Sequence, residues 1–135
     1  MSVRPNHSVI CIYSMIKPVT SIALMMLYEE GKLHLHEPVG KYIPEFAKTK
    51  VFNKVGYAGN ELSDQQSPMT VHQLLTHTSG LTYGFFMDNP VEEMVRKSSF
   101  SDHTVSLEDT IKEIAQFPLI FQPGARWNYG VSTDG

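Results

Sequence analysis

Pro18 limits where the longest helix predicted for this chain can begin. Proline lacks the backbone N–H that would bond the carbonyl of Ser14, and this loss costs about 3 kcal/mol inside a helix. In the first turn the cost is small, so we expect Ser14 to lie at the helix start. Apolar side chains then recur at helical spacing until Gly31, which is suited to end the helix. They are Val19, Ile22, Ala23, Met26 and Leu27.

Lys17 follows Ser14 by three residues, so both side chains share one face of the predicted helix. A serine hydroxyl is a weak nucleophile unless a base lies within hydrogen-bond reach. The positive end of a helix disfavours a nearby ammonium, which favours a lysine that acts as general base. The N–H of Ser14 could also donate one arm of an oxyanion hole. On spacing alone, however, an N-capping Ser14 and a solvated Lys17 are the preferred interpretation.

Shorter elements are predicted after this helix. Prolines and glycines interrupt residues 33–68 repeatedly, which indicates turns and short elements. Thr70 begins a second helix, with Gln73 completing a capping box, and Gly80 is expected to stop it. A short helix is expected over about residues 90–97.

Ser106 is predicted to cap a last helix, and Pro118 to end it. Its side chains expected to face inward are Leu107, Ile111, Ile114 and Ala115. The sequence therefore predicts a mainly helical chain with several loops.

Composition and charge exclude several classes of function. A length of 135 residues fits one domain at most, and a net charge of −3 gives no global attraction to nucleic acid or anionic membranes. No stretch reaches the roughly 18 to 20 apolar residues that span a bilayer, and residues 1–12 do not form a signal peptide. One cysteine, Cys11, excludes an internal disulfide. These features favour a cytoplasmic protein, and they do not predict an oligomeric state.

His34 and His36 have the His-x-His spacing of zinc hydrolases. The further acid and histidine of that motif are missing, because Glu37 and Pro38 follow instead. Solvated histidines in a turn are the preferred interpretation, and no metal or cofactor is predicted.

Four phrases, in this order, resemble the β-lactamase-related serine hydrolases, and most closely the class C β-lactamase-like esterases. The resemblance covers roughly residues 12–134, and the order of the phrases makes it far more specific than any one of them. The phrases are IYSMIKPVTS at 12–21, MMLYEEGKL at 25–33 with PVGKYIPEF at 38–46, LLTHTSGL at 74–81, and QPGARWNY at 122–129.

The resemblance implies an α+β fold in which helices pack beside a sheet and the nucleophile begins a central helix. It implies that Ser14 attacks a small ester, or a β-lactam, to form an acyl-serine, while Lys17 and Tyr129 share the proton transfer. Without the resemblance, Tyr129 would be a half-buried aromatic beside Trp127 with its hydroxyl at the surface. The family phrase implies a structural role for His77. On the resemblance, the aromatic run of Tyr83, Phe85 and Phe86 is expected to line an acyl pocket, with simple packing as the alternative.

The sequence departs from the family at several positions. Ile16 stands where a small hydroxyl residue is usual, and Cys11 where arginine is common. Gly130 replaces a serine or alanine, and Val131 replaces the asparagine of the true class C lactamases. The change at Val131 favours esterase activity over efficient lactamase activity.

Only part of the family domain is expected in this sequence. Residues 1–11 are interpreted as a loose lead-in, and residues 12–135 as a partial domain, since relatives are more than twice as long. Their third motif, a Lys-Thr-Gly strand that supplies an oxyanion donor, has no match here. One such donor is worth about 3 to 4 kcal/mol, and the helices would expose apolar faces meant for the sheet. The alternative hypothesis is therefore a catalytically inert fragment that acts as a helical structural or interaction module.

Overall fold

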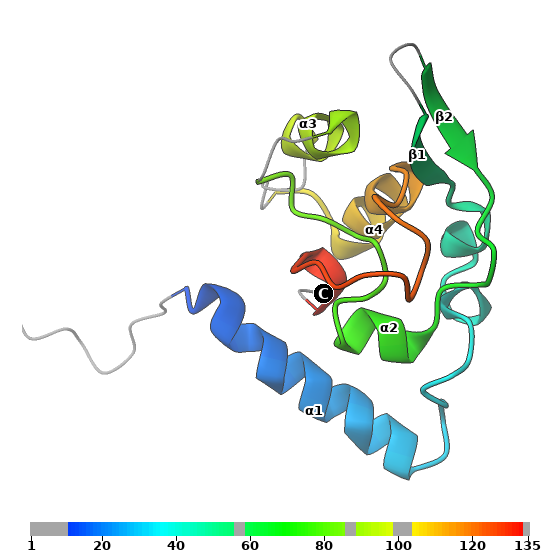
Figure 1. Cartoon of the computed structure of the whole chain (residues 1–135). Coiled ribbons are helices and arrows are strands. Elements are labelled where there is room, and N and C mark those ends of the chain that lie inside the picture. The colour runs from blue at the N-terminus through cyan, green and yellow to red at the C-terminus, as the bar shows by residue number, and fades with distance from the viewer. Residues whose placement is uncertain (1–10, 56–58, 86–88, 99–103, 134–135) are drawn as a thin grey trace, which may run out of the picture.

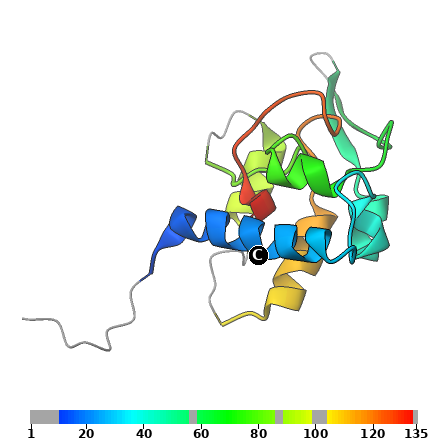
Figure 2. The same ribbon diagram turned by 90° about the horizontal axis from the view of Figure 1, so that it is seen from below.

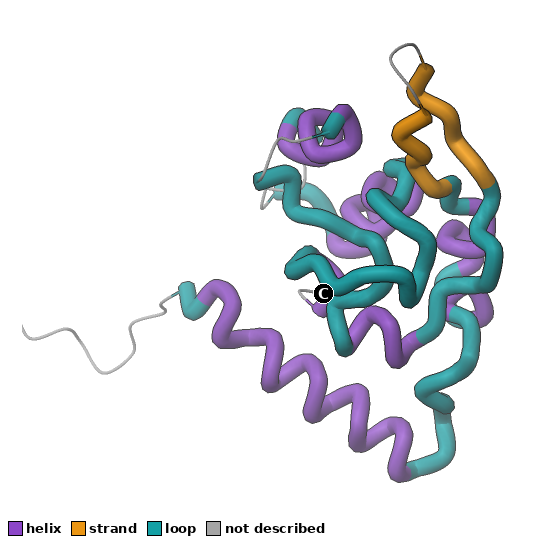
Figure 3. Tube along the Cα trace, viewed as in Figure 1, coloured by secondary structure: helices purple, strands orange, loops and turns teal. Residues whose placement is uncertain are grey.

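The computed structural model describes residues 11–55, 59–85, 89–98 and 104–133 (Figure 1). The long helix α1 (Ile16–Glu29) lies along one side of the molecule, and a β-hairpin lies at the opposite side. Shorter helices and loops fill the region between them (Figure 3). No helix within the described ranges is both long and apolar enough to cross a membrane.

Helix α1 begins and ends close to where the sequence predicts. A 3₁₀ turn at Tyr13–Met15 leads into it. At the other end, Gly31 takes a left-handed φ of 70°, and the N–H of Lys32 donates to the carbonyl of Leu27 over 2.9 Å. This bond and the one from Gly31 to Tyr28 form a Schellman motif, so the predicted glycine stop is confirmed.

The apolar stripe of α1 faces solvent. Ile22 is 63% exposed, and Val19 and Met26 are each more than half exposed. The opposite face of the helix packs on the body through half-buried Leu24 and a buried Lys17. The expectation that this fragment would leave apolar helix faces uncovered is met on α1.

The segment after α1 pairs with the start of helix α2 (Val71–Leu75). Pro38 and Thr70 form an antiparallel bridge, and the N–H of Val39 donates to the carbonyl of Met69 over 2.8 Å. Gln65 adds a side-chain link: its amide donates to the carbonyls of Phe46 and Thr49, and its oxygen accepts from the N–H of Met69. These bonds hold residues 35–49, which include 3₁₀ turns at Val39–Lys41 and Pro44–Lys48, against α2.

Strands β1 (Val51–Val55) and β2 (Gly59–Ser63) form an antiparallel hairpin in which Val51 pairs with Ser63 and Val55 with Gly59. Leu119 bridges Val51 from the other side in parallel. The sequence predicts only turns and short elements here, because alternation of apolar and polar residues over five positions is a weak signal for a strand.

The remaining helices follow their predicted caps. Thr70 and Gln73 form the expected capping box, but α2 ends at Leu75, well before Gly80. His77, with a φ of 56°, occupies the left-handed position after the helix, so the prediction that Gly80 stops α2 is wrong.

Helix α3 (Pro90–Arg96) is capped by Asn89, and α4 (Leu107–Gln116) by Ser106. Ala115 is buried and Ile111 and Ile114 are half-buried as expected, but Leu107 is 60% exposed. The inward placement of Leu107 is therefore wrong, because the first turn of α4 extends past the core.

The hydrophobic core lies between α2, α4 and the hairpin. A 3₁₀ turn at Val131–Thr133 contacts both α1 and α2 and so closes the core toward the long helix (Figure 2). The buried residues of the core come from many short segments: Leu33, Val39, Phe46, Val51, Met69, Val71, Leu81, Ala115, Leu119 and Val131.

Candidate active site

Ser14 lies in the 3₁₀ turn immediately before α1, and its side chain is exposed. Tyr13, which precedes it, has a φ of 47°, in the left-handed region that non-glycine residues rarely adopt. The N-cap position of α1 belongs to Met15, and no side chain caps the helix. The interpretation of Ser14 as an N-cap is therefore wrong, and its hydroxyl is available for another contact.

Lys17 is the one buried residue of α1, with 8% of its surface exposed. Its ammonium group donates to the hydroxyl of Tyr83 over 2.5 Å. It also lies 5.0 Å from the ring centre of Tyr83 and 5.1 Å from that of Tyr129, both cation–π distances. The alternative of a solvated Lys17 is wrong, because two aromatic rings cover the ammonium.

Tyr129 brings a second hydroxyl to the serine. Its hydroxyl donates to the Oγ atom of Ser14 over 2.9 Å, across 115 positions of sequence. The ring packs against those of His77, at 4.9 Å between centres, and Tyr83, at 5.6 Å. Ser14, Lys17 and Tyr129, the three residues singled out in the sequence, thus meet at one place. Tyr129 is half-buried and its hydrogen bond to Ser14 lies at the surface, which also agrees with the alternative of a half-buried aromatic; the structure adds Ser14 as the partner of its hydroxyl.

The loop that carries Tyr129 is fastened to the loop after α2. The N–H of Asn128 donates to the carbonyl of His77 over 2.9 Å, and the N–H of Gly130 donates to the Nδ1 atom of the same histidine over 3.4 Å. The hydroxyls of Ser79 and Ser132 share a hydrogen bond of 2.8 Å. His77 therefore has a structural role, as expected. Its left-handed backbone turns the chain after α2, and its carbonyl and Nδ1 atom accept the hydrogen bonds that hold the Tyr129 loop.

Gly130 departs from the family pattern for a steric reason. A Cβ atom at this position would lie 2.3 Å from the carbonyl oxygen of Leu81 and 3.2 Å from the Cα atom of Thr82. Only glycine lets the two backbones approach this closely. Serine or alanine would force apart the loops that carry Tyr129 and Tyr83.

Tyr83 is the site residue whose contact the sequence interpretation missed. The sequence predicts for it only a place in an acyl pocket or simple packing, whereas its hydroxyl accepts the hydrogen bond of the Lys17 ammonium. Its ring stacks on Phe85 with 4.9 Å between centres and 17° between planes, and Phe85 is itself 70% exposed. Phe86 lies outside the described residues, so an acyl pocket built by this run stays a prediction. The sequence feature that could have pointed to Tyr83 as a site residue is its position two residues after the LLTHTSGL phrase.

The two histidines of the His-x-His pattern lie in a turn rather than on a strand, and both are exposed. The ring of His36 lies 5.6 Å from that of His72. Over the described part of the chain, no three histidine, cysteine or acidic side chains gather closely enough to hold a metal ion.

Comparison with known proteins identifies the relatives of this chain. The β-lactamase family model matches residues 2–135. The chain belongs to the β-lactamase family. The α+β fold expected from the resemblance is confirmed, and this chain contributes mainly helical parts of it.

Members of this β-lactamase family with related sequences include esterases and acyltransferases. Acyltransferase calJ of Penicillium decumbens is 34% identical over 128 residues, and esterase EstB of Burkholderia gladioli is 31% identical over 126 residues. Among solved structures, unliganded simvastatin synthase (LovD) of Aspergillus terreus matches with a TM-score of 0.66 and 32% identity.

These matches cover most of this chain but a minor part of each relative. They cover 93% of the chain and 29% of calJ, 90% of the chain and 29% of EstB, and 90% of the chain and 29% of simvastatin synthase. The chain thus spans less than a third of the length of these relatives.

Proposed function

We propose that this chain carries the nucleophile and the proton-transfer residues of a serine esterase that acts on small esters. The observation that supports the proposal most directly is the hydrogen bond of 2.9 Å between the Tyr129 hydroxyl and the exposed Oγ atom of Ser14. The Lys17 ammonium beside both tyrosine rings supports it further. The names of the relatives, esterases and acyltransferases, agree with acyl-transfer chemistry.

In the proposed reaction, the Oγ atom of Ser14 attacks the carbonyl carbon of the ester. In the reacting form, Tyr129 is a phenolate beside the Lys17 ammonium. Its oxygen takes the Oγ proton during the attack, and the resulting phenol gives this proton to the departing alkoxide, so an alcohol leaves and an acyl-serine remains. Water repeats the sequence and releases the acid. The cationic Lys17 stabilises negative charge on the tyrosine oxygen while the proton moves. Val131 stands two residues after Tyr129 in place of an asparagine, which favours esters over β-lactams as substrates.

A fluorophosphonate probe tests the nucleophile directly, because attack by a serine oxygen on phosphorus expels fluoride and leaves a stable adduct. We expect intact-mass analysis of the treated chain to show one adduct, and peptide mapping to place it on Ser14. Ser14→Ala should abolish the adduct, whereas Ser21→Ala, a serine on the same helix, should keep it. An adduct that persists in Ser14→Ala would refute the assignment.

The proton-transfer residues are tested by the rate of the same labelling. Tyr129→Phe should slow it by about 10² to 10⁴-fold, the usual contribution of general acid–base catalysis. Tyr28→Phe, which alters an exposed tyrosine at the end of α1, should leave the rate unchanged. Equal rates for Tyr129→Phe and the unaltered chain would exclude Tyr129 from the reaction.

The second candidate function is an inert helical module that binds another surface. The exposed apolar stripe of α1 favours it. Hydrolysis of p-nitrophenyl butyrate by this chain, abolished by Ser14→Ala, would refute it. Lack of both hydrolysis and the phosphonate adduct would support it.

A further inference from the structure

Glu92 is a buried acid that the proposed reaction does not use. It lies in the first turn of α3 with 1% of its surface exposed, and its backbone N–H donates to the side-chain oxygen of the Asn89 cap over 3.1 Å. A carboxyl group is seldom fully buried unless it has partners, because its removal from water costs several kcal/mol. One partner of its carboxyl group is Thr82, which lies in the loop after α2.

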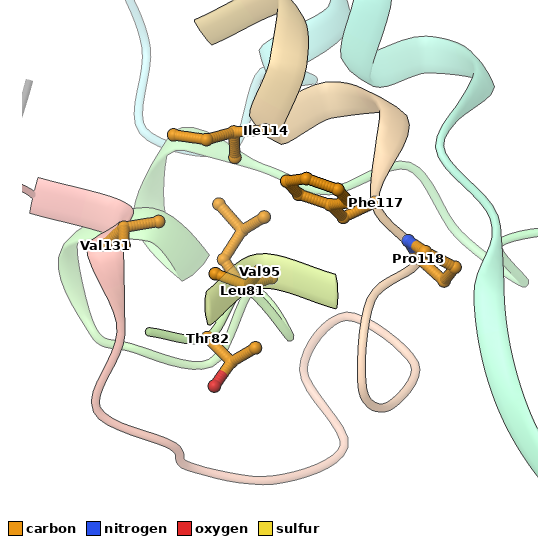
Figure 4. Close-up of a pocket in the computed structure, with 7 residues that line it drawn as sticks. All are labelled: Leu81, Thr82, Val95, Ile114, Phe117, Pro118 and Val131. Carbon is orange, nitrogen blue, oxygen red and sulfur yellow. The ribbon is translucent and has the colours of Figure 1, made fainter. Parts of the chain in front are cut away.

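Thr82 joins this loop to α3 through its hydroxyl. The Oγ1 atom donates to a carboxyl oxygen of Glu92 and accepts the N–H of Gly84 over 3.4 Å. Thr82 also lines a cavity of about 10 Å³ whose other walls are apolar, and its hydroxyl points away from them (Figure 4). Thr82 is 4% exposed, so its hydroxyl depends on these protein partners.

Gly84 fixes the other end of the same short loop on α3. Its φ is 80°, and a Cβ atom there would lie 2.6 Å from the carbonyl oxygen of Glu92 and 2.9 Å from the nitrogen of Arg96. The loop backbone therefore rests directly on the helix backbone. Thr82 and Gly84 flank Tyr83, so both neighbours of this tyrosine are held by α3.

We propose that Glu92 is a positioning residue: through Thr82 it holds the loop of residues 82–84 on α3, and so places the Tyr83 hydroxyl against the Lys17 ammonium. This inference rests on the proposed function for its effect on rate, but not for its effect on geometry. Hydrogen bonds to a carboxylate are stronger than those to neutral acceptors, and more so at low local dielectric. A carboxyl at residue 92 therefore anchors the loop better than an apolar side chain would.

The first test measures the geometry without any enzyme activity. An N-hydroxysuccinimide acetate reagent acetylates accessible lysines, and peptide mass spectrometry gives the rate at Lys17, with the 65% exposed Lys32 side chain as internal reference. Thr82→Val removes the hydroxyl at nearly constant volume, and we expect Lys17 to be acetylated at least about tenfold faster. Thr82→Ser keeps the hydroxyl and should stay within about threefold of the unaltered chain.

Thr49→Val is the matched control for a purely structural effect. Thr49 is also buried, and its hydroxyl donates to the carbonyl of Ala115 over 2.9 Å, in another part of the core. Its loss should lower stability by a similar amount and leave Lys17 protected. Equal Lys17 acetylation in Thr49→Val and Thr82→Val would overturn the proposal, as would an unchanged rate in a folded Thr82→Val. If Thr82→Val does not fold, Thr82→Cys supplies a weak donor of similar size and is held to the same criterion.

The second test measures the rate of phosphonate labelling at Ser14. We expect Glu92→Leu to slow labelling by about 10 to 100-fold, because a displacement near 1 Å at a reacting centre can cost about 10²-fold. Glu92→Gln keeps an acceptor oxygen and should recover most of the rate. If the unaltered chain is not labelled, the proposed function fails and the acetylation result still decides the positioning role. If it is labelled and Glu92→Leu reacts equally fast, the positioning role fails alone.

Discussion

Replacing Gly130 with alanine tests how closely the Tyr129 loop must approach the rest of the site. The added Cβ atom would lie 2.3 Å from the carbonyl oxygen of Leu81, about 1.1 Å inside ordinary van der Waals contact, which begins at 3.4 Å. It would also lie 2.9 Å from the carbonyl carbon of Leu81. Both obstructing atoms belong to the backbone, so no side-chain rotation can relieve the overlap. The two loops must move apart by about 1 Å.

The expected cost follows from this overlap. Overpacking of a well-packed site destabilises a protein by about 1 to 3 kcal/mol. At about 4 °C per kcal/mol for a chain of this size, the Tm should fall by about 4 to 12 °C. The shift also carries the Tyr129 hydroxyl away from Ser14, so labelling of Ser14 should slow by up to about 10²-fold.

Trp127, the one tryptophan of the chain, reports on the same loop, since its ring meets that of His77 edge-on at 6.3 Å. Its emission, thermal unfolding by circular dichroism and Ser14 labelling form the assay. Gly31→Ala is the control: residue 31 has a φ of 70° but nothing within 4 Å of an added Cβ atom. It should cost about 1 to 2 kcal/mol from backbone strain and leave the emission and the labelling unchanged. The steric reasoning is refuted if Gly130→Ala keeps all three signals, or if Gly31→Ala alters the emission and the labelling equally.

Three further changes give distinct outcomes. Gln65→Met removes three hydrogen bonds to backbone groups and should lower the free energy of unfolding by about 2 to 4 kcal/mol; a loss below about 0.5 kcal/mol in urea would contradict this. The Lys41 ammonium and a neighbouring tyrosine hydroxyl hold the pKa of Glu37 at about 2, below its ordinary 4.5, so its stabilisation is complete above about pH 4.5 and is lost toward pH 2. Glu37→Gln should therefore lower the urea midpoint at pH 6 and have no effect on it at pH 2. A difference in midpoint between Glu37→Gln and the unaltered chain that grows as the pH falls would contradict this reasoning. Ile22→Gln with Met26→Gln should reduce the fluorescence of bound anilinonaphthalene sulfonate while the free energy of unfolding changes by less than about 0.5 kcal/mol; a larger loss would show that the stripe is packed.

Local signals in the sequence predicted the helices well. Pro18, the Schellman glycine at residue 31, the capping box at Thr70 and the serine cap at residue 106 each act within one turn of the chain. Their effect depends on nearby backbone groups alone, so they hold whatever surrounds the helix. The hairpin was missed for the opposite reason, because a strand is stabilised by pairing with distant residues, such as Leu119 beside Val51.

Periodicity could not predict which face of α1 is buried and which is exposed to solvent. The stripe of apolar residues is a correct prediction of a helix face, yet this face is exposed, and the buried face carries Lys17. A hydrophobic period indicates which residues share a face, but only the packed structure shows which neighbours that face meets.

The sequence by itself determined the candidate residues Ser14, Lys17 and Tyr129, because their types and order repeat a family pattern and Pro18 sets the start of the helix. Only the tertiary structure decided that they meet, since Tyr129 is 115 positions from Ser14 and its approach depends on the missing side chain of Gly130. The tertiary structure also shows that the Tyr83 hydroxyl is a partner of Lys17, and that the backbone next to Tyr83 rests on α3. Contacts between residues so far apart in the chain arise from the packing of whole loops, which no local pattern encodes.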